Sequence, residues 1–313
     1  MSHNSIKNNK LAKNTALLYI RMMVVMIINL YSVRLVLNAL GIEDFGIFNV
    51  IAGIVTLLVS VTSVLQTATQ RYYSYSLGKN NLEYLQTIFS SSIYIYVILS
   101  VLIIIIGETV GLWFVNTQLI IPDDRMYAAN WIYQLSIFSF VASIMHIPYS
   151  AATIAHEDMG YFAFISAAES LLKLIAIILI SFISIDSLIV YGAGLFLISI
   201  FVLTFYIVIG YTKYPECHYK KPMDKTLFKE LLSFSGWSLF GSVSGVGMSQ
   251  VNTILTNIYF GPLVNGARAI SFQFNMAMSS LVSSFLMAVR PSMTKSYAEE
   301  SYLYLNKVFN LSN

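Results

Sequence analysis

Apolar residues in this 313-residue chain are gathered into long runs, and short polar clusters separate one run from the next. Each run approaches or exceeds the roughly 18 residues that indicate a membrane-spanning helix. An open sheet edge in lipid would leave backbone groups unpaired, so the runs predict helices. Eight spans are predicted, at 15–39, 45–69, 89–115, 128–148, 161–185, 188–211, 234–259 and 263–289. The pattern therefore predicts an all-α, polytopic membrane protein.

Composition excludes several classes of function. The chain is 57% hydrophobic and 11% charged, against roughly 25% charged in a soluble domain, which argues against a soluble enzyme. Its net charge of +3 is too small and too dispersed for nucleic-acid binding. The single cysteine, Cys217, has no disulfide partner and no Cys/His cluster beside it, so we expect no structural metal and no cofactor.

The positions of Lys and Arg predict the orientation, because basic loops stay in the cytoplasm. Segments on the side of the N-terminus hold thirteen of the 18 basic residues, whereas the opposite loops hold only Arg125. The connection at 146–160 has no basic residue and is the weakest point of this map. The first apolar run follows Lys7, Lys10 and Lys13 and lacks a small-x-small cleavage site, so we interpret it as a retained helix. Both ends of the chain are predicted to face the cytoplasm.

An internal repeat relates the first two spans to the last two. Gly41 and Gly46 align with Gly261 and Gly266 at an offset of 220, and Arg71 aligns with Arg290 at 219. The spans start on the same side, so the repeat is parallel. It predicts a six-helix lobe at 1–211, a cytoplasmic linker at 212–230 and the first two helices of an incomplete second lobe at 231–313. The complete exporter would have at least twelve helices, so we expect this chain to be a fragment or a truncated product.

Six ionisable residues fall within the predicted spans, where a charge is costly and is a functional-site hypothesis by default. They are Arg21, Arg34, Glu108, Glu169, Lys173 and Arg268. Lys173 lies about twelve residues, roughly 18 Å, from either end of its span, and Arg21 about 9 Å from its nearer end. The plain alternative for Lys173 is a structural pair with Glu169 one turn earlier, and for Arg21 it is snorkelling to the interface.

Polar residues also form stripes at helical spacing on two spans. One stripe includes Asn49, Thr56, Ser60 and Ser63, and the other includes Arg268, Asn275 and Ser279. Such stripes often serve close helix packing. The repeat places the two stripes on equivalent helices, which is what a water-filled cavity between two lobes requires. Four buried cations against two anions favour an anionic cargo, because Arg and Lys bind phosphate oxygens through charge-assisted hydrogen bonds.

The residues themselves resemble a known family. The segments "LGIEDFGIFNVIAGIV", "TQRYYSYSLGK", "IPYSAATIAHEDMGYFAFIS" and "FGPLVNGARAIS" are similar to the polysaccharide-biosynthesis membrane proteins. These are O-antigen-type flippases of the multidrug/oligosaccharidyl-lipid/polysaccharide exporter superfamily. The resemblance covers nearly the whole chain and implies two six-helix bundles in a V shape, a fold shared with multidrug exporters.

The resemblance implies a transporter rather than an enzyme, in the bacterial cytoplasmic membrane. The implied activity is translocation of an undecaprenyl-diphosphate-linked oligosaccharide by alternating access, with the glycolipid, membrane lipid and other polysaccharide assembly proteins as partners. We expect the diphosphate on Arg21, with Lys173, Arg34 and Arg268 assisting. Glu169 is a hypothesis for ion coupling, releasing Lys173 when protonated. The alternatives are a multidrug or cation antiporter, which needs carboxylates, a membrane glycosyltransferase or polymerase, and a membrane scaffold.

Overall fold

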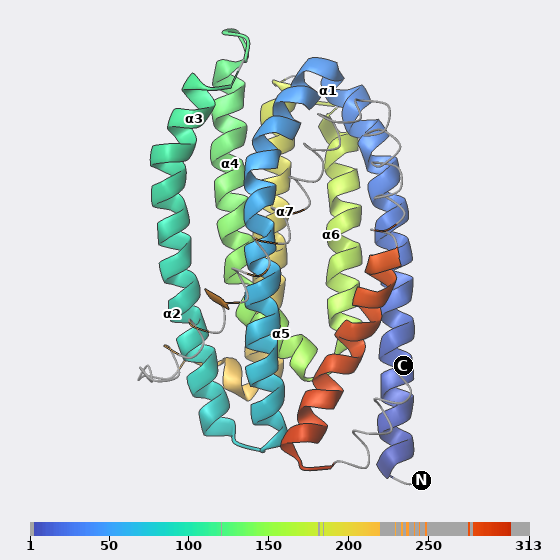
Figure 1. Cartoon of the computed structure of the whole chain (residues 1–313). Helices are drawn as coiled ribbons and strands as arrows, with labels where there is room; N and C mark the ends of the chain where they lie inside the picture. The colour runs from blue at the N-terminus through green and yellow to red at the C-terminus, as the bar shows by residue number, and fades with distance from the viewer. Residues whose placement is uncertain are drawn as a thin grey trace.

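The computed structural model describes residues 3–119, 121–180, 182–183, 185–219 and 278–301, with eight isolated positions between 229 and 275. Side chains at 3–8, 42 and 52–61 lie outside this description. All described regular structure is helical, and the helices stand side by side in one bundle (Figure 1). We call the end of the bundle that carries the N-terminus the lower end, and the opposite end the upper end, as they lie in Figure 1.

Helix α1 spans His3–Gly78 and consists of two limbs that meet at Gly41. Gly41 has φ 79° and ψ 173°, a backbone conformation that only glycine adopts readily. The first limb runs from the lower to the upper end, and the second limb returns beside it (Figure 1). The predicted spans at 15–39 and 45–69 are therefore the two limbs of one helical hairpin.

The next pair consists of α4 and the continuous segment that includes α2 and α3. Helix α2 (Leu82–Ile106) continues through a π-helical turn, η1 (Gly107–Gly111), into α3 (Leu112–Thr117). A Cβ on Gly107 or Gly111 would overlap Ile137 or Tyr133 of α4, so the π turn lies directly on that helix. The Gly107 carbonyl accepts from the Leu112 amide within the π turn, and the Tyr133 hydroxyl donates to the same oxygen at 2.8 Å, which ties the turn to α4.

The fourth span is longer than its sequence predicts. Helix α4 (Met126–Met145) is followed after His146 by α5 (Ile147–Ala155), all of whose residues are buried. Pro148 lies in the first turn of α5, where its missing N–H group is tolerated, so it kinks the span instead of ending it. The predicted connection at 146–160 is wrong for residues 147–155, and the chain turns only at 156–158, where Glu157 has φ 61°.

Two further helices complete this unit, which we call the α1–α7 body. Helix α6 (Met159–Ile180) packs mainly on α1, and α7 (Ser187–Lys213) packs mainly on α4. The Asp186 side chain caps α7 by accepting from the Leu188 and Ile189 amides. A short 3-10 helix, η2 (Pro215–Cys217), then places Cys217 in the core at the lower end.

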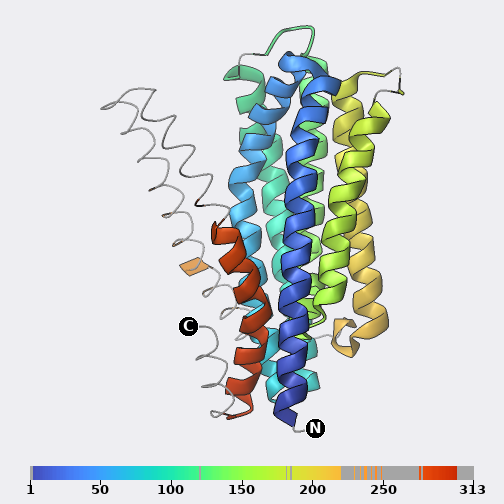
Figure 2. The same cartoon turned by 90° about the vertical axis from the view of Figure 1, so that its right-hand side faces the viewer.

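A helix at 278–298, drawn in red, lies against the body at its lower end (Figure 2). Val289 packs with Leu11 of α1, and the Ser280 hydroxyl lies 3.4 Å from the Met22 sulfur. The approach is closest at Gly78, where a Cβ would lie 2.6 Å from the Ala298 Cβ. Residues far apart in sequence are therefore joined at one end of the bundle.

The helices have the length and surface of a multi-pass membrane protein. Five segments of the described chain qualify as membrane spans by length and hydropathy: Asn9–Gly41, Leu82–Thr117, Met126–Ala155, Met159–Ile180 and Ser187–Lys213. Large apolar side chains are exposed along these helices, as lipid contact requires. The predicted span at 234–259 lies almost wholly outside the described residues, and that at 263–289 is described mainly from 278 onward, where it is helical.

Candidate functional site

The first candidate feature is the ion pair on α6. Lys173 donates to Glu169 at 2.6 Å, one helical turn apart. Both side chains lie on the face of α6 that carries the buried Phe162 and Ile180, away from the exposed Leu171. Their exposed fractions are nevertheless 42% and 36%. The pair therefore lies on the packed side of α6 while both side chains stay partly exposed.

Arg21 approaches the same face of α6 from α1. Its guanidinium carbon lies 4.6 Å from the centre of the Phe162 ring, a cation–π contact. Its Nε atom is buried and has no hydrogen-bond partner. Glu169 lies close enough for its charge to act on Arg21. The structure thus brings Arg21, Glu169 and Lys173 into one neighbourhood.

Two residues that the sequence did not single out complete this neighbourhood. His146, at the kink between α4 and α5, stacks on Tyr206 of α7 with ring centres 5.1 Å apart. The charge of Glu169 acts on both of these residues as well. The sequence placed His146 where the predicted span 128–148 overlaps the predicted connection 146–160, and it gave the residue no role. We call Arg21, His146, Glu169, Lys173 and Tyr206 the polar cluster, to which α1, α6, α7 and the α4–α5 kink contribute.

The remaining predicted phosphate ligands lie elsewhere. Arg34 is exposed on the face of α1 that also carries Ile20, Met23 and Ile27, and it is not part of the polar cluster. Arg268 lies outside the described residues. Glu108 on the π turn accepts from the Gln134 amide at 2.9 Å, nearer the upper end. The structure brings together two of the four predicted cations.

The residues predicted to line a cavity are only partly described. Asn49 is exposed, and its amide donates to the Phe45 carbonyl. Ser63 is exposed as well, and Ser279 donates to Asn275 at 3.4 Å on an exposed face. The side chains of Thr56 and Ser60 lie outside the description. Cavity lining by these residues stays a prediction.

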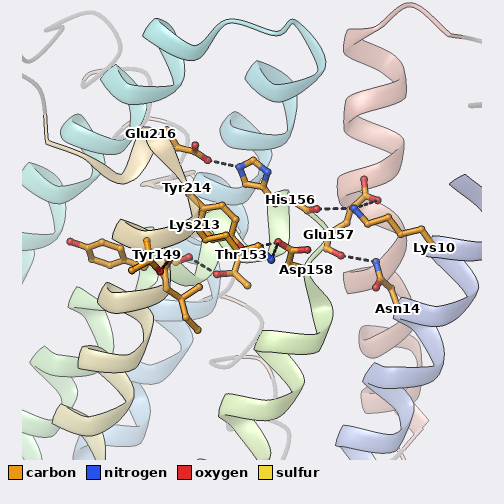
Figure 3. Close-up of polar contacts among 12 residues, drawn as sticks. Lys10, Asn14, Tyr149, Thr153, His156, Glu157, Asp158, Lys213, Tyr214 and Glu216 are labelled. Atoms are coloured by element: carbon orange, nitrogen blue, oxygen red, sulfur yellow. Dashed lines mark hydrogen bonds and ion pairs between the residues drawn. The ribbon is translucent and has the colours of Figure 1, made fainter. Parts of the chain in front are cut away.

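A second set of charged residues gathers at the lower end, around the 156–158 turn (Figure 3). From α1, Lys10 donates to the His156 carbonyl at 3.1 Å and Asn14 to the Glu157 carbonyl at 2.9 Å. Lys295, on the helix at 278–298, lies 3.2 Å from the Glu157 carboxylate. Burial lowers the pKa of Lys295, and the charge of Glu157 opposes that shift without reversing it.

The same turn is also tied to the end of α7. Asp158 lies 2.9 Å from Lys213 and accepts from the Tyr214 hydroxyl at 2.9 Å. Burial raises the pKa of Asp158, but these hydrogen bonds together with the charges of Lys213 and Lys10 outweigh it and hold the pKa below its ordinary value. His156 lies 2.5 Å from the buried carboxylate of Glu216 in η2. One tight turn therefore connects α1, α7, η2 and the helix at 278–298.

One hollow of the lower end is separate from the polar cluster. A cavity of about 220 Å³ lies beside the turn between α1 and α2, and its wall is mostly apolar. Its lining includes Asn80, Asn81, His156 and Glu216, but none of the predicted cargo residues. Within the described part of the chain, no three His, Cys, Asp or Glu side chains are grouped as metal ligands would be.

The sequence matches the family described as "Polysaccharide biosynthesis protein" over residues 11–297. The chain belongs to this family. Structural similarity agrees with a transporter fold. A multidrug resistance MATE family transporter of the MOP superfamily, in an outward-facing conformation, superposes with a TM-score of 0.81 at 12% identity, over 97% of this chain and 68% of its own.

Two other solved structures give a similar result. A MATE protein in complex with MaD3S has a TM-score of 0.83 at 12% identity, with 97% of this chain and 69% of that chain covered. A MOP superfamily transporter from Pyrococcus furiosus, whose binding pocket is described as having reverse polarity, has a TM-score of 0.78 at 11% identity, with 96% and 68% covered. No curated protein matches the sequence. At these identities, the similarity establishes the fold of this polysaccharide biosynthesis family member and leaves its cargo open.

Proposed function

We propose that this family member moves an undecaprenyl-diphosphate-linked oligosaccharide across the bacterial cytoplasmic membrane by alternating access, for O-antigen or capsular polysaccharide synthesis. The observation that carries the proposal is the polar cluster, in which two cations, Arg21 and Lys173, face one carboxylate inside a membrane bundle. A charge held inside the membrane at a cost of a few kcal/mol calls for a partner of opposite sign. A diphosphate supplies that partner.

Arg21 is the first anchor in this proposal. Its guanidinium has a ring face as a neighbour but no hydrogen-bond acceptor at Nε, so it retains an unused donor. Arginine matches phosphate oxygens with two parallel donors, which makes it the better of the two cations for a diphosphate. Arg34 and Arg268 assist in this proposal as further cations along the path of the headgroup.

Lys173 is the second anchor, and Glu169 controls it. In the resting pair, the carboxylate satisfies the ammonium group at 2.6 Å, so Lys173 is occupied. Releasing the carboxylate frees an ammonium group on a partly exposed side chain. Glu169 thereby couples cargo binding to an ion gradient. The sugars occupy the polar cavity lined by Asn49, Thr56, Ser60, Ser63, Asn275 and Ser279, while the prenyl chain stays in lipid.

The proposal also assigns the sides of the membrane. The lower end carries Lys10, Lys13, Lys79, Lys213 and Lys295 and faces the cytoplasm, according to the distribution of basic residues. The body and the helix at 278–298 belong to two lobes that rock against each other. Contacts such as Glu157 with Lys295 then break when the site opens to the cytoplasm.

The test is surface glycan display in a bacterial strain that lacks its own flippase. We expect Arg21→Ala and Lys173→Ala to abolish display while their membrane levels, measured by immunoblot, stay normal. Lys13→Ala, an exposed basic residue on the same helix as Arg21, is the matched control and should display glycan normally. Normal display with both cluster variants would refute the assignment.

A multidrug or cation antiporter is the second candidate, since solved structures of MATE proteins share the fold. A cationic drug needs an excess of carboxylates, and the polar cluster has one carboxylate against two cations. We therefore favour the anionic cargo. A drug-susceptibility panel on a deletion strain distinguishes the two functions, because only the antiporter protects against cationic drugs.

A further inference from the structure

The position of His146 follows from the unexpected length of the fourth span. Its backbone N–H donates to Ala142 at 3.2 Å and its carbonyl accepts from Ser150 at 3.0 Å, so the residue lies inside a continuous helical path. It lies nine positions before Ala155, which places it about 13 Å above the lower end of the span. A histidine predicted at the end of a span therefore lies well inside the candidate membrane span Met126–Ala155.

The surroundings of the imidazole are incomplete in one respect. One ring face is covered by Tyr206, with an interplanar angle of 19°. The Nδ1 atom is buried and has no hydrogen-bond partner. In neutral histidine one ring nitrogen donates and the other accepts, so a buried nitrogen without a partner is unsatisfied in either tautomer. A change in the charge of the ring therefore changes what this nitrogen requires from its neighbours.

The charged groups around His146 come from the helices that pack on the kink. Helix α6 contributes Glu169, whose charge acts on the ring, with Lys173 paired to it. Helix α1 contributes Arg21, and α7 contributes the phenol of Tyr206. The descending limb of α1 contributes the neutral Gln66, which lies 3.3 Å from the Ser150 hydroxyl.

Helix α2 adds no charge at this position. It carries no Asp, Glu, Lys, Arg or His between Glu83 and Glu108. Its buried Tyr96 hydroxyl is bonded to Thr69 and is thus engaged elsewhere. Among the residues that the structure describes, Glu169 is therefore the anion whose charge acts on His146, and Arg21 and Lys173 are the cations that compete with it.

We propose that His146 is a proton-binding site, and that its protonated ring draws the Glu169 carboxylate away from Lys173. Histidine is the side chain whose ordinary titration falls between about pH 5 and 8, so a physiological proton gradient can change its charge. The proton resides on the imidazole, and Glu169 stays ionised throughout. This differs from protonation of Glu169 itself, because the carboxylate changes partner and keeps its charge.

The consequence for transport rests on the proposed function of Lys173. Protonation of His146 frees the Lys173 ammonium group to bind a phosphate oxygen, and loss of the proton returns Glu169 to Lys173 and expels the cargo. Proton binding and anion binding at the polar cluster thus favour each other. By linkage, an anion bound at Lys173 raises the proton affinity of His146 to the same extent.

The test is direct titration of the four histidines in the full chain, labelled with ¹³C-histidine and placed in lipid nanodiscs. We expect one resonance that disappears in His146→Gln and titrates reversibly between about pH 4 and 9. Its midpoint should move toward acid by about one pH unit in Glu169→Gln, because the variant removes the anion that stabilises the imidazolium. His218→Gln, which removes an exposed ring at the lower end, is the control and should leave that midpoint unchanged.

Two results would overturn the proposal: a His146 resonance that does not titrate, or one whose midpoint is unmoved in Glu169→Gln. If His146→Gln does not insert stably, the resonance is assigned in a variant that keeps His146 as the single histidine. The titration needs no cargo, so it is independent of glycan display. A titrating, Glu169-linked His146 with normal display in both Arg21→Ala and Lys173→Ala would retain the proton site and reject the flippase assignment.

Discussion

Charged side chains tie the α1–α7 body together at both ends, but the two ends differ in what they join. At the upper end, Arg125 donates through Nε to Asp44 at 2.8 Å and through Nη1 to Asp186 at 2.6 Å. These three residues belong to the three upper turns of the same body. At the lower end, ties within the body such as Asp158 with Lys213 are accompanied by contacts of Glu157 with Lys295 and of Lys79 with Glu300 at 3.5 Å, which cross to the segment 278–301.

This difference separates the contacts that stabilise the α1–α7 body from those that determine how closely the helix at 278–298 approaches it. The upper ties connect turns that a rigid body keeps at fixed distances, so their loss should lower stability. The lower ties join the body to a helix that is distant in sequence, so their loss should change how closely the two approach. In an alternating-access transporter, only contacts of the second kind need to break in each cycle.

The largest effect is expected from Arg125→Ala. The three side chains are 13 to 26% exposed, and the substitution leaves two carboxylates without their cation. Partial solvent screening reduces the penalty of a fully buried pair, so we expect a loss of about 1 to 3 kcal/mol in unfolding free energy. Thermal unfolding in detergent measures it, with the exposed Asp124→Ala in the same turn as the control.

The pH dependence of this upper tie has a definite sign. Burial raises the pKa of Asp186, but the hydrogen bonds and charge of Arg125 outweigh burial and hold it below its ordinary value. The unfolded chain therefore binds more protons than the folded chain near pH 4. The stabilisation is present above about pH 4 and is lost as the pH falls through the folded pKa. Equal unfolding temperatures for wild type and Arg125→Ala at pH 7 would contradict the predicted stabilisation by this tie.

The next effect is expected from Gly78→Ala at the lower end, where a shift of the helix at 278–298 can relieve part of the overlap. The added Cβ would lie 2.6 Å from the Ala298 Cβ and 2.7 Å from the Lys295 carbonyl oxygen, so the helix at 278–298 must move outward. Overpacking of this kind costs about 1 to 3 kcal/mol. Spin labels at the exposed positions Leu82 and Tyr297 report the separation, and the native Cys217 is fully buried.

Gly160→Ala is the matched control for that measurement. A Cβ on Gly160 meets no atom within 4 Å, so the label distance should be that of the wild-type protein. An unchanged distance in Gly78→Ala would show that the lower end tolerates the extra atom, and the close approach would then not hold the helix at 278–298 in place.

The smallest effect is expected from charge reversal at Glu157. Glu157→Lys places a cation between Lys10 and Lys295, which favours separation by about 1 kcal/mol because the pair is partly exposed. The double variant with Lys295→Glu restores opposite charges and should recover part of the wild-type label distance. Recovery is incomplete because Lys10 still faces the new lysine. If the double variant gave the same label distance as Glu157→Lys alone, the contact between Glu157 and Lys295 would not contribute to that distance.

Several features of the fold were predictable because they depend on residues close in sequence. Hydropathy predicts helices and a membrane protein, since a span needs only a continuous apolar run. The Glu169–Lys173 pair follows from its four-residue spacing on a helix, and the structure has it at 2.6 Å. The grouping of Asp44, Arg125 and Asp186 at one end also agrees with the assignment of their loops to one side.

Other features required the folded molecule. The continuation of the fourth span through Pro148 was missed, because proline at a first helical turn and proline after a helix end look alike in sequence. That difference moved His146 from the predicted end of the span to its interior, where it joins the polar cluster. The π turn at 107–111 also leaves little signal in an apolar run, although it fixes where Glu108 meets Gln134.

The sequence by itself determined that this protein is helical, spans a membrane repeatedly and carries Arg21, Glu169 and Lys173 at membrane depth, because length, hydropathy and four-residue spacing are local properties. Only the tertiary structure decided that Arg21 joins Glu169 while Arg34 does not, and that Glu157 meets Lys295. Those outcomes depend on the rotation and depth of each helix relative to its neighbours. Packing between distant segments sets both quantities, and no local pattern encodes them.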